Sequence, residues 1–490
     1  MAVLAGKGSN QAVFATAAGR NRHDLSTVHA AVAAGHPATA AAGLEVLEAG
    51  GSAADAAVAA SLASCVAETV MTGLLGGGHA VHYEAASGRA RNLDCFVAVP
   101  GVGAGPGSHA ELLELEVPFG TELVHYAVGI ASCGVPGLPA GLAALHAEHG
   151  RLPWPRLVEP ALGLAHEGVE LPPAHAACLA MLEPVMTMNE GAAIYAPGNA
   201  LLTTGDRLRQ PGLVRALELL ADEGPRSPYG GSLGRALLEL MAERGGLVTR
   251  DDLAGYRAVW SDPLEVGYAG TRVLTREGLA PLADCLRELP ELRGIAPGPR
   301  AVAVAQVLDR PDAEGDTTNL VTVDAEGNAC VLTSSLGLGA GDWLPGLDVH
   351  LNSMLGEADL IRGELAPGER MGSMMSPALA FDGNGLALAG GAAGGTRLRS
   401  ALVQVLAGTL DDGLSAEEAV ERPRLHPAAG TVHLEPGFPD DVPAALEAAG
   451  YDVSAWPARH HYFGGVSVVT RNGAAGDPRR SGAAAILADA

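Results

Sequence analysis

A short stretch around residue 317 limits the fold of this 490-residue chain more than any other. Residues 318–323 alternate between apolar and polar side chains and are rich in β-branched residues, which is typical of a β-strand. A turn-forming stretch, 324–328, follows, and 329–333 has the composition of a second strand. The sequence therefore predicts a β-hairpin two-thirds of the way along the chain, with Thr317 at its edge.

Thr317 could act as a nucleophile if the chain were cut immediately before it. A threonine hydroxyl is a weak nucleophile, and its own α-amino group can serve as its general base. Because that amino group is free only at an N-terminus, this hypothesis requires cleavage between Asp316 and Thr317. The alternative is that Thr317 and Thr318 only begin an ordinary strand.

Several further motifs accompany the hairpin in a fixed order. They are residues 36–57, 68–78, 370–377, 389–397, 422–426 and 476–479. The first two read as a pair of helices followed by a glycine-rich loop, and 389–397 contains the sequence Gly394-Gly395. Together these motifs resemble the gamma-glutamyltranspeptidase family of N-terminal-nucleophile hydrolases.

The resemblance implies an α+β fold, a four-layer α-β-β-α sandwich with two antiparallel central sheets. Self-cleavage would produce a large subunit, 1–316, and a small subunit, 317–490, which remain one folded unit because strands of both share the sheets. Periodicity in the chain fits alternating helices and hairpins. Helices are predicted at 38–48, 53–68, 137–149, 155–167, 212–222, 231–243, 396–409 and 440–449, and hairpins at 79–96, 318–335 and 378–390.

The resemblance also assigns catalytic roles. Thr317 is the expected nucleophile, and the backbone N–H groups of Gly394 and Gly395 are the expected oxyanion donors. Ser335 occupies the place of a threonine that supports the nucleophile in the family. The alternatives are a simple turn at Gly394-Gly395 ahead of a helix, and a solvent-facing strand serine at position 335.

The expected substrate pocket departs from the family pattern. The family holds the free α-carboxylate of the glutamyl group with an arginine, and Phe96 stands in its place. A phenylalanine cannot form the bidentate pair that a guanidinium makes with a carboxylate. Glu357 could replace the family's acidic partner for the α-amino group. The other expected substrate-binding positions are Gly337, Asn352, Ser373 and Met374.

These features imply a self-processing threonine hydrolase or acyltransferase that works through an acyl-threonine intermediate on a donor other than a standard γ-glutamyl group. Three alternatives stay open. They are a carbon–carbon bond hydrolase of a proline-type precursor in antibiotic biosynthesis, an ordinary gamma-glutamyltranspeptidase or glutathione hydrolase, and an unprocessed, non-catalytic binding homologue. The expected partners are a small-molecule substrate and the two fragments themselves, and a homodimer is left open. No metal or other cofactor is expected, because the nucleophile carries its own base.

Composition excludes several other classes. Lys and Arg number 31 against 56 Asp and Glu, and a net charge of −25 disfavours nucleic-acid binding. Residues 53–75 are long and apolar, but they contain Asp55 and Glu68, which favours a buried helix over a membrane span. The six cysteines are widely spaced and indicate neither a zinc site nor a disulfide framework. The first residues show no export signal, so a cytoplasmic location is expected.

Overall fold

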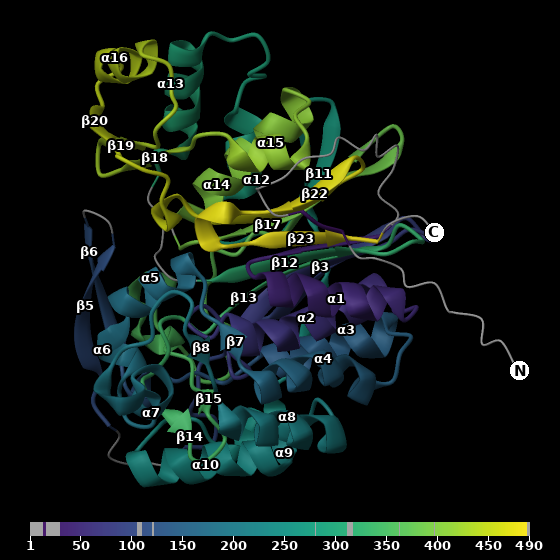
Figure 1. Cartoon of the computed structure of the whole chain (residues 1–490), viewed down its shortest axis with the longest axis vertical. Coiled ribbons are helices and arrows are strands. Elements are labelled where there is room, and N and C mark those ends of the chain that lie inside the picture. Colours follow the sequence, from purple (N-terminus) through teal and green to yellow (C-terminus); the bar gives the residue numbers. More distant parts are fainter. Residues whose placement is uncertain are drawn as a thin grey trace, which may run out of the picture.

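A computed structural model of the chain describes residues 13–15, 30–104, 110–119, 122–279, 281–310, 317–361, 363–395 and 397–487. Two sheets lie face to face at its centre, and helices cover the outer side of each sheet (Figure 1). This arrangement is the expected four-layer α-β-β-α sandwich, so the predicted fold is confirmed.

The first sheet contains eight strands among the described residues, in the order β1-β23-β2-β12-β13-β3-β4-β9. Every neighbouring pair runs antiparallel. The strands are β1 Val13–Ala15, β2 Ala31–Ala34, β3 Gly77–Glu84, β4 Arg89–Cys95, β9 Val259–Ser261, β12 Thr318–Val323, β13 Ala329–Ser335 and β23 Ala483–Ile486. The predicted hairpin at 318–335 is confirmed as β12 and β13, and it occupies the middle of the sheet.

The second sheet is also antiparallel and has the order β10-β11-β16-β17-β21-β22. Its strands are β10 Leu264–Tyr268, β11 Thr271–Thr275, β16 Ala378–Asp382, β17 Gly385–Ala393, β21 Gly465–Thr470 and β22 Gly473–Gly476. The predicted hairpin at 378–390 is therefore confirmed as β16 and β17.

Helices form the two outer layers (Figure 1). The first sheet is covered by α1 Pro37–Glu48, α2 Ala53–Ala67, α3 Leu138–His149 and α4 Trp154–Glu167, with α8 Pro211–Glu223 and α10 Ser232–Arg244 further out. The second sheet is covered by α12 Leu282–Glu288, α14 Arg397–Leu406 and α15 Ala416–Glu421, with α13 Pro297–Leu308 further out beside α16 Asp441–Ala448. The helices predicted from the sequence in these regions are confirmed, with shifts of a few residues at their ends.

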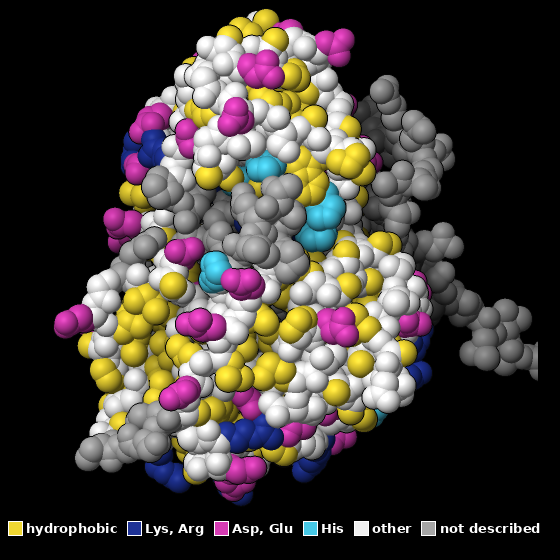
Figure 2. Space-filling model, turned by 90° about the vertical axis from the view of Figure 1, so that its left-hand side faces the viewer, with side chains coloured by type: hydrophobic (Ala, Val, Ile, Leu, Met, Phe, Trp, Pro, Cys, Tyr) yellow, Lys and Arg dark blue, Asp and Glu magenta, His cyan; other side chains and the backbone are white. Residues whose placement is uncertain are grey.

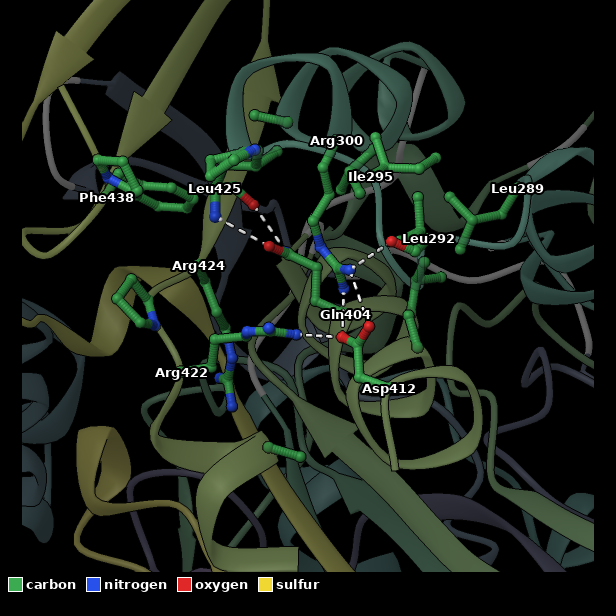
Figure 3. A pocket seen from close by; sticks show the side chains of 18 of the residues that line it. Leu289, Leu292, Ile295, Arg300, Gln404, Asp412, Arg422, Arg424, Leu425 and Phe438 are labelled. Carbon is green, nitrogen blue, oxygen red and sulfur yellow. Dashed lines mark hydrogen bonds and ion pairs between the residues drawn. The ribbon is translucent and has the colours of Figure 1, made fainter. Parts of the chain in front are cut away.

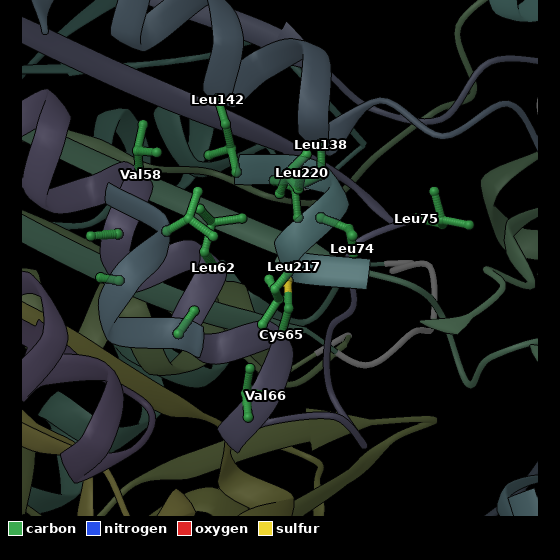
Figure 4. Close-up of a cluster of buried hydrophobic side chains, with 14 of the residues drawn as sticks. Val58, Leu62, Cys65, Val66, Leu74, Leu75, Leu138, Leu142, Leu217 and Leu220 are labelled. Atoms are coloured by element: carbon green, nitrogen blue, oxygen red, sulfur yellow. The ribbon is translucent and has the colours of Figure 1, made fainter. Parts of the chain in front are cut away.

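Helix α2 shows how an apolar helix is accommodated. Ser52 and Asp55 form a capping box at its start, and every residue of the helix is buried. A helix that is apolar on all sides must be enclosed by protein or lipid. Here α1, α3 and α4, together with the strands β12 and β13, supply that enclosure, and Val58 and Leu62 of α2 pack with Leu142 of α3 and other leucines (Figure 4). No helix of the described residues is long and apolar enough to cross a membrane.

The central hairpin has two distinct faces, because successive side chains of a strand point to opposite sides. Leu320 and Leu332 belong to the core beneath the helices, whereas Val321 and Val331 belong to the core between the sheets. By the same alternation, Thr318 faces the helices and Thr317 precedes the strand on the side of the second sheet.

Smaller elements surround this body. A three-stranded sheet of β18 Leu425–Ala428, β19 Thr431–Leu434 and β20 Asp452–Ala455 carries α16 Asp441–Ala448 at the upper left of Figure 1. The others are β5 Leu113–Phe119, β6 Glu122–Val128, β7 Val169–Glu170, β8 Arg207–Leu208, β14 Trp343–Leu344, β15 Val349–His350, α5 Pro173–Met181, α6 Glu183–Met186, α7 Gly191–Tyr195, α9 Ser227–Gly230 and α11 Arg250–Gly255. On the face shown in Figure 2, acidic side chains are scattered and basic ones gather at a few points, so this face has no broad basic surface.

Candidate active site

Thr317 is buried directly before β12, with 6% of its surface exposed. The backbone N–H of Gly394 donates a hydrogen bond of 2.9 Å to the Thr317 hydroxyl oxygen. Gly394 follows the last residue of β17, so the facing sheet delivers this donor. The structure thus brings together the expected nucleophile and one expected oxyanion donor. Asp316, the other side of the expected cleavage site, lies outside the described residues.

Only glycine fits the position of Gly394. Its φ of +125° is rarely adopted by other residues, and an added Cβ would lie 2.8 Å from the Cα of Gly464. Gly395 also has a positive φ, and the pair leads from β17 into α14. A turn does occur at Gly394-Gly395, and this turn directs the Gly394 N–H toward the hydroxyl of Thr317.

A small cavity opens beside Thr317, with about 20 Å³ of space, enough for about one water molecule. Most of the positions predicted for the site line it. They are Phe96, Thr317, Ser335, Glu357, Ser373, Met374 and Gly395. These residues are spread along the sequence from position 96 to position 395 and lie in or near strands of both sheets. Only folding brings them together.

The rest of the cavity wall is apolar and was not predicted from the sequence. Its members are Met354, Leu360, Met375 and Leu398. Met354, Leu360 and Met375, together with Met374, also pack with Phe96 in one buried cluster. Methionine is unbranched and adapts its shape, so such a wall can rearrange around an apolar group.

Phe96 is 2% exposed and stacks on His79, with ring centroids 5.4 Å apart. Two guanidinium groups lie near this wall but are used elsewhere. Arg276 donates to the carbonyl oxygens of Ser373 and Met375, at 3.2 and 3.0 Å, and burial lowers its pKa to about 10. Arg370 pairs with Asp94 at 3.3 Å. No arginine or lysine occurs among the described residues that line the cavity.

Ser335 is 2% exposed, so the solvent-facing alternative for this serine is wrong. Its hydroxyl accepts a hydrogen bond of 2.9 Å from the N–H of Gly337. Gly337 itself has no place in the cavity wall, but a Cβ there would lie 2.5 Å from a carboxylate oxygen of Glu357. Gly337 therefore allows the carboxylate to approach the end of the hairpin.

Asn352 lies outside the cavity wall and ties three backbone segments together. Its side-chain oxygen accepts from the N–H of Gly134 at 3.0 Å, and its amide group donates to the carbonyls of Leu75 and Gly134, each at 2.9 Å. These bonds hold Leu75 of the glycine-rich loop and the backbone at Gly134 against the segment that continues to Met354 and Glu357 in the cavity wall. The side chain of Asn352 therefore binds backbone groups and does not line the cavity.

On the other side of the hairpin, Glu68 is buried beneath Thr318. Its carboxylate accepts from the hydroxyl of Thr39 at 2.6 Å and from the hydroxyl of Thr318. Burial raises the pKa of Glu68 to about 7, although these hydrogen bonds and the charge of Arg480 oppose the shift. Glu68, Arg480 and Thr317 line a second small cavity. No role for Glu68 or Arg480 was predicted from the sequence. The one sequence feature that could have indicated a role for Glu68 is its position as a carboxylate in an otherwise apolar stretch.

The geometry suits acyl transfer. A hydroxyl oxygen lies 2.9 Å from a backbone donor, at the boundary of an apolar cavity with a single carboxylate. Attack by this oxygen on a carbonyl would build negative charge next to a donor that the turn already holds in place.

Comparison with known proteins gives a consistent result. A family model described as Gamma-glutamyltranspeptidase matches residues 39–281 and 295–487. The chain is 31% identical to the Acylase ACY 1 proenzyme of Pseudomonas sp. (strain V22), covering 90% of this chain and 89% of the acylase. It is 25% identical to the Glutathione hydrolase proenzyme of Bacillus subtilis (strain 168), covering 92% and 90%. Its fold is similar to a crystal structure of cephalosporin acylase from Bacillus halodurans, with a TM-score of 0.76 at 22% identity and coverage of 98% and 96%.

Proposed function

Because the chain belongs to the gamma-glutamyltranspeptidase family, a hydrolase and acyltransferase family, we propose that it is a self-processing threonine acylase for apolar acyl groups. The observation that carries this proposal is the hydrogen bond from Gly394 to the Thr317 hydroxyl at the edge of an apolar cavity. Both relatives named above are called proenzymes, which fits a chain that is cut before it acts.

Processing would proceed by attack of the Thr317 hydroxyl on the carbonyl of residue 316. The peptide bond breaks, an ester forms, and water hydrolyses it to leave a free α-amine on Thr317. In the mature enzyme this amine accepts the hydroxyl proton while the oxygen attacks the substrate carbonyl. The leaving amine takes the proton, and water or an acceptor amine then removes the acyl group from Thr317.

The cavity wall supports a donor without a free carboxylate. Glu357 carries the only charged side chain among the described residues of the wall, and a second carboxylate beside it would be repelled. Phe96 offers no hydrogen bond to an anion, and Arg276 is held by backbone carbonyls behind the wall. A carboxylate accepts several hydrogen bonds, so Glu357 can tolerate an amine on the donor.

The present cavity holds about one water molecule, so a bound acyl group needs more room. Met354, Met374 and Met375 can supply it by changing rotamers, since each has a flexible unbranched side chain. This requirement favours slim acyl chains over branched or bulky ones.

Three p-nitroanilides that share one carbon chain test the proposal. Butanoyl, 4-aminobutanoyl and γ-glutamyl anilides differ only by an amine and then a carboxylate. We expect kcat/KM for the γ-glutamyl compound to be at least about tenfold below the other two, and Phe96→Arg to narrow that gap. Fastest release from the γ-glutamyl compound would identify an ordinary transpeptidase.

Processing is tested on the same preparation. A denaturing gel should show two bands, and sequencing of the smaller fragment should begin Thr-Thr-Asn-Leu. Thr317→Ala should give a single full-length band with no anilide hydrolysis. A single band and no hydrolysis for the unmutated protein would indicate a binding homologue without catalysis.

A further inference from the structure

A much larger cavity lies in the outer helix layer of the second sheet (Figure 3). It has a volume of about 340 Å³, within the range of small-molecule sites. It lies between the α12–α13 region, α14, the chain after α15, and the turn around Phe438. None of its described lining residues belongs to the two cavities beside Thr317, so it is a separate feature.

Part of one wall of this cavity lies outside the stretches that match the family model. Leu289, Leu292 and Gly294 line it, and all three fall in the gap between the two stretches that match the family model. Ile295 extends the same wall, and Phe438 lies on the opposite side in Figure 3. The family model therefore does not cover Leu289, Leu292 and Gly294.

Three charged side chains form a cluster between Leu292 and Phe438 (Figure 3). Both Nη atoms of Arg300 bind the carboxylate of Asp412, at 3.0 and 2.6 Å, and Arg422 binds the same carboxylate (Figure 3). Two guanidinium groups thus share one carboxylate, which leaves one positive charge in excess. Asp412 is the only hydrogen-bond partner of the Arg422 guanidinium among the described residues, and this guanidinium has five N–H donors. Since its side chain is 39% exposed, the remaining donors are accessible to an anion.

The other polar side chains of the cavity already have partners, although the buried Nε of Arg424 makes no hydrogen bond among the described residues. Gln404 donates to the carbonyls of Ser400 and Leu425, at 2.8 and 2.9 Å, and accepts from the Leu425 N–H. Arg424 is paired with Asp477 at 2.6 Å. The excess charge is therefore located at Arg300 and Arg422, and Arg300 also donates to the carbonyl of Leu292, in the apolar wall, at 3.1 Å.

From this arrangement we infer that the cavity binds a small carboxylic acid with an apolar body. The carboxylate lies against Arg422 and Arg300, where a guanidinium offers paired donors. The carbon chain lies against Leu289, Leu292 and Phe438, where it is removed from water. This site does not depend on Thr317 or on the proposed acylase activity.

Calorimetric titration of the purified protein with octanoate and with octanamide tests the inference. The two probes share a carbon chain and differ in charge. We expect octanoate to bind at least about tenfold more tightly than octanamide. Arg422→Gln should raise the Kd of octanoate by about tenfold and leave that of octanamide unchanged. Arg215→Gln, at an exposed ion pair on α8, is the matched control and should change neither.

Filling the cavity provides a second readout. Ala301 lines the cavity on α13, and Ala301→Phe should abolish binding of both probes. Circular dichroism checks that each variant is folded. Octanoate affinity that is unchanged in Arg422→Gln would overturn the inference and place the probe elsewhere, for instance in the acyl cavity at Thr317. Failure of octanoate to bind the unmutated protein at millimolar concentration would overturn it as well.

Discussion

Gly394 combines a backbone angle that other residues avoid with a hydrogen bond to Thr317, the proposed nucleophile. A methyl group on it would clash with Gly464 and turn its N–H away from Thr317. Loss of one oxyanion donor typically lowers kcat by about 100-fold to 1,000-fold. We therefore expect Gly394→Ala to lower kcat for butanoyl anilide by at least about 100-fold. Steady-state kinetics on the processed protein measures this.

Gly383 is the matched control for that substitution. It lies in the turn between β16 and β17, has no positive φ, and has nothing within 4 Å of an added Cβ. Gly383→Ala should therefore change kcat by less than about twofold, because surface changes away from special features have small effects. Full activity of Gly394→Ala would show that this N–H does not stabilise the transition state.

Glu68 gives the protein a predictable pH dependence of stability. Burial raises its pKa from 4.5 to about 7. Between pH 4.5 and pH 7 the folded state therefore keeps a proton on Glu68 that the unfolded state has released. The contribution of Glu68 to the free energy of unfolding is full below pH 4.5 and is lost as the pH rises toward 7. The loss is about 3 kcal/mol, at 1.36 kcal/mol for each unit of pKa. Glu68→Gln lacks the titrating group, and the variant should gain about 3 kcal/mol relative to the unmutated protein between pH 5 and 8.

Urea denaturation at both pH values measures this difference. Using Thr317→Ala as the background keeps both proteins as single chains, so fragment dissociation does not enter. Glu326→Gln is the control, because hydrogen bonding from Arg151 lowers the pKa of this exposed carboxylate and keeps it ionised at both pH values. An equal stability difference at pH 5 and pH 8 for Glu68→Gln would contradict the raised pKa.

At the scale of elements, Asp324 connects the central hairpin to α2. One of its carboxylate oxygens accepts from the N–H of Ala53, at the start of α2, at 2.9 Å. The other accepts from the N–H groups of Glu326 and Asn328 in the hairpin turn, at 3.1 and 2.9 Å. The side chain is buried, and removing it takes the acceptor from three backbone donors, of which the Ala53 N–H is buried and the other two are partly buried.

We expect Asp324→Ala to lower the free energy of unfolding by about 3 kcal/mol, since one buried unsatisfied donor costs about 1–3 kcal/mol and the two partly buried hydrogen bonds of the turn are lost with it. Urea denaturation in the Thr317→Ala background measures it. Asp382→Ala is the control at the end of β16, where the carboxylate pairs with Arg471 on a half-exposed surface. This control should cost less than about 1 kcal/mol. An equal decrease in the free energy of unfolding for the two variants would show that Asp324 does not stabilise the contact between the hairpin and α2 more than a surface carboxylate does.

The helices and hairpins were predictable because the sequence patterns that indicate them are local. The helices α1 and α2 have a clear start at Pro37 and at the Ser52 cap, and the hairpin has a turn between two β-rich runs. The layer order was not derivable from periodicity and came from the resemblance. Contacts between distant residues were also out of reach, as with Glu68 and Thr318, which are 250 positions apart. The methionine wall was missed for the same reason, because its members are adjacent only after folding.

At the scale of the whole molecule, the proposed fragments 1–316 and 317–490 are interleaved. In the first sheet, β12 and β13 of the small fragment lie between β2 and β3 of the large one, and β2 lies between β12 and β23. In the second sheet, β11 of the large fragment pairs with β16 of the small one. Each fragment alone would expose both unpaired strand edges and the core between the sheets.

Cleavage should therefore leave the fragments together under native conditions and make them inseparable without unfolding. We expect gel filtration of the processed protein to give one species that contains both fragments. After separation in urea, neither fragment alone should show a cooperative unfolding transition on return to buffer, since neither can bury its half of the core. Mixing them before removal of urea should restore at least part of the transition. A small fragment that folds cooperatively by itself would mean that the sheets are less interdependent than the strand order implies, and subunit exchange between enzymes would then become feasible.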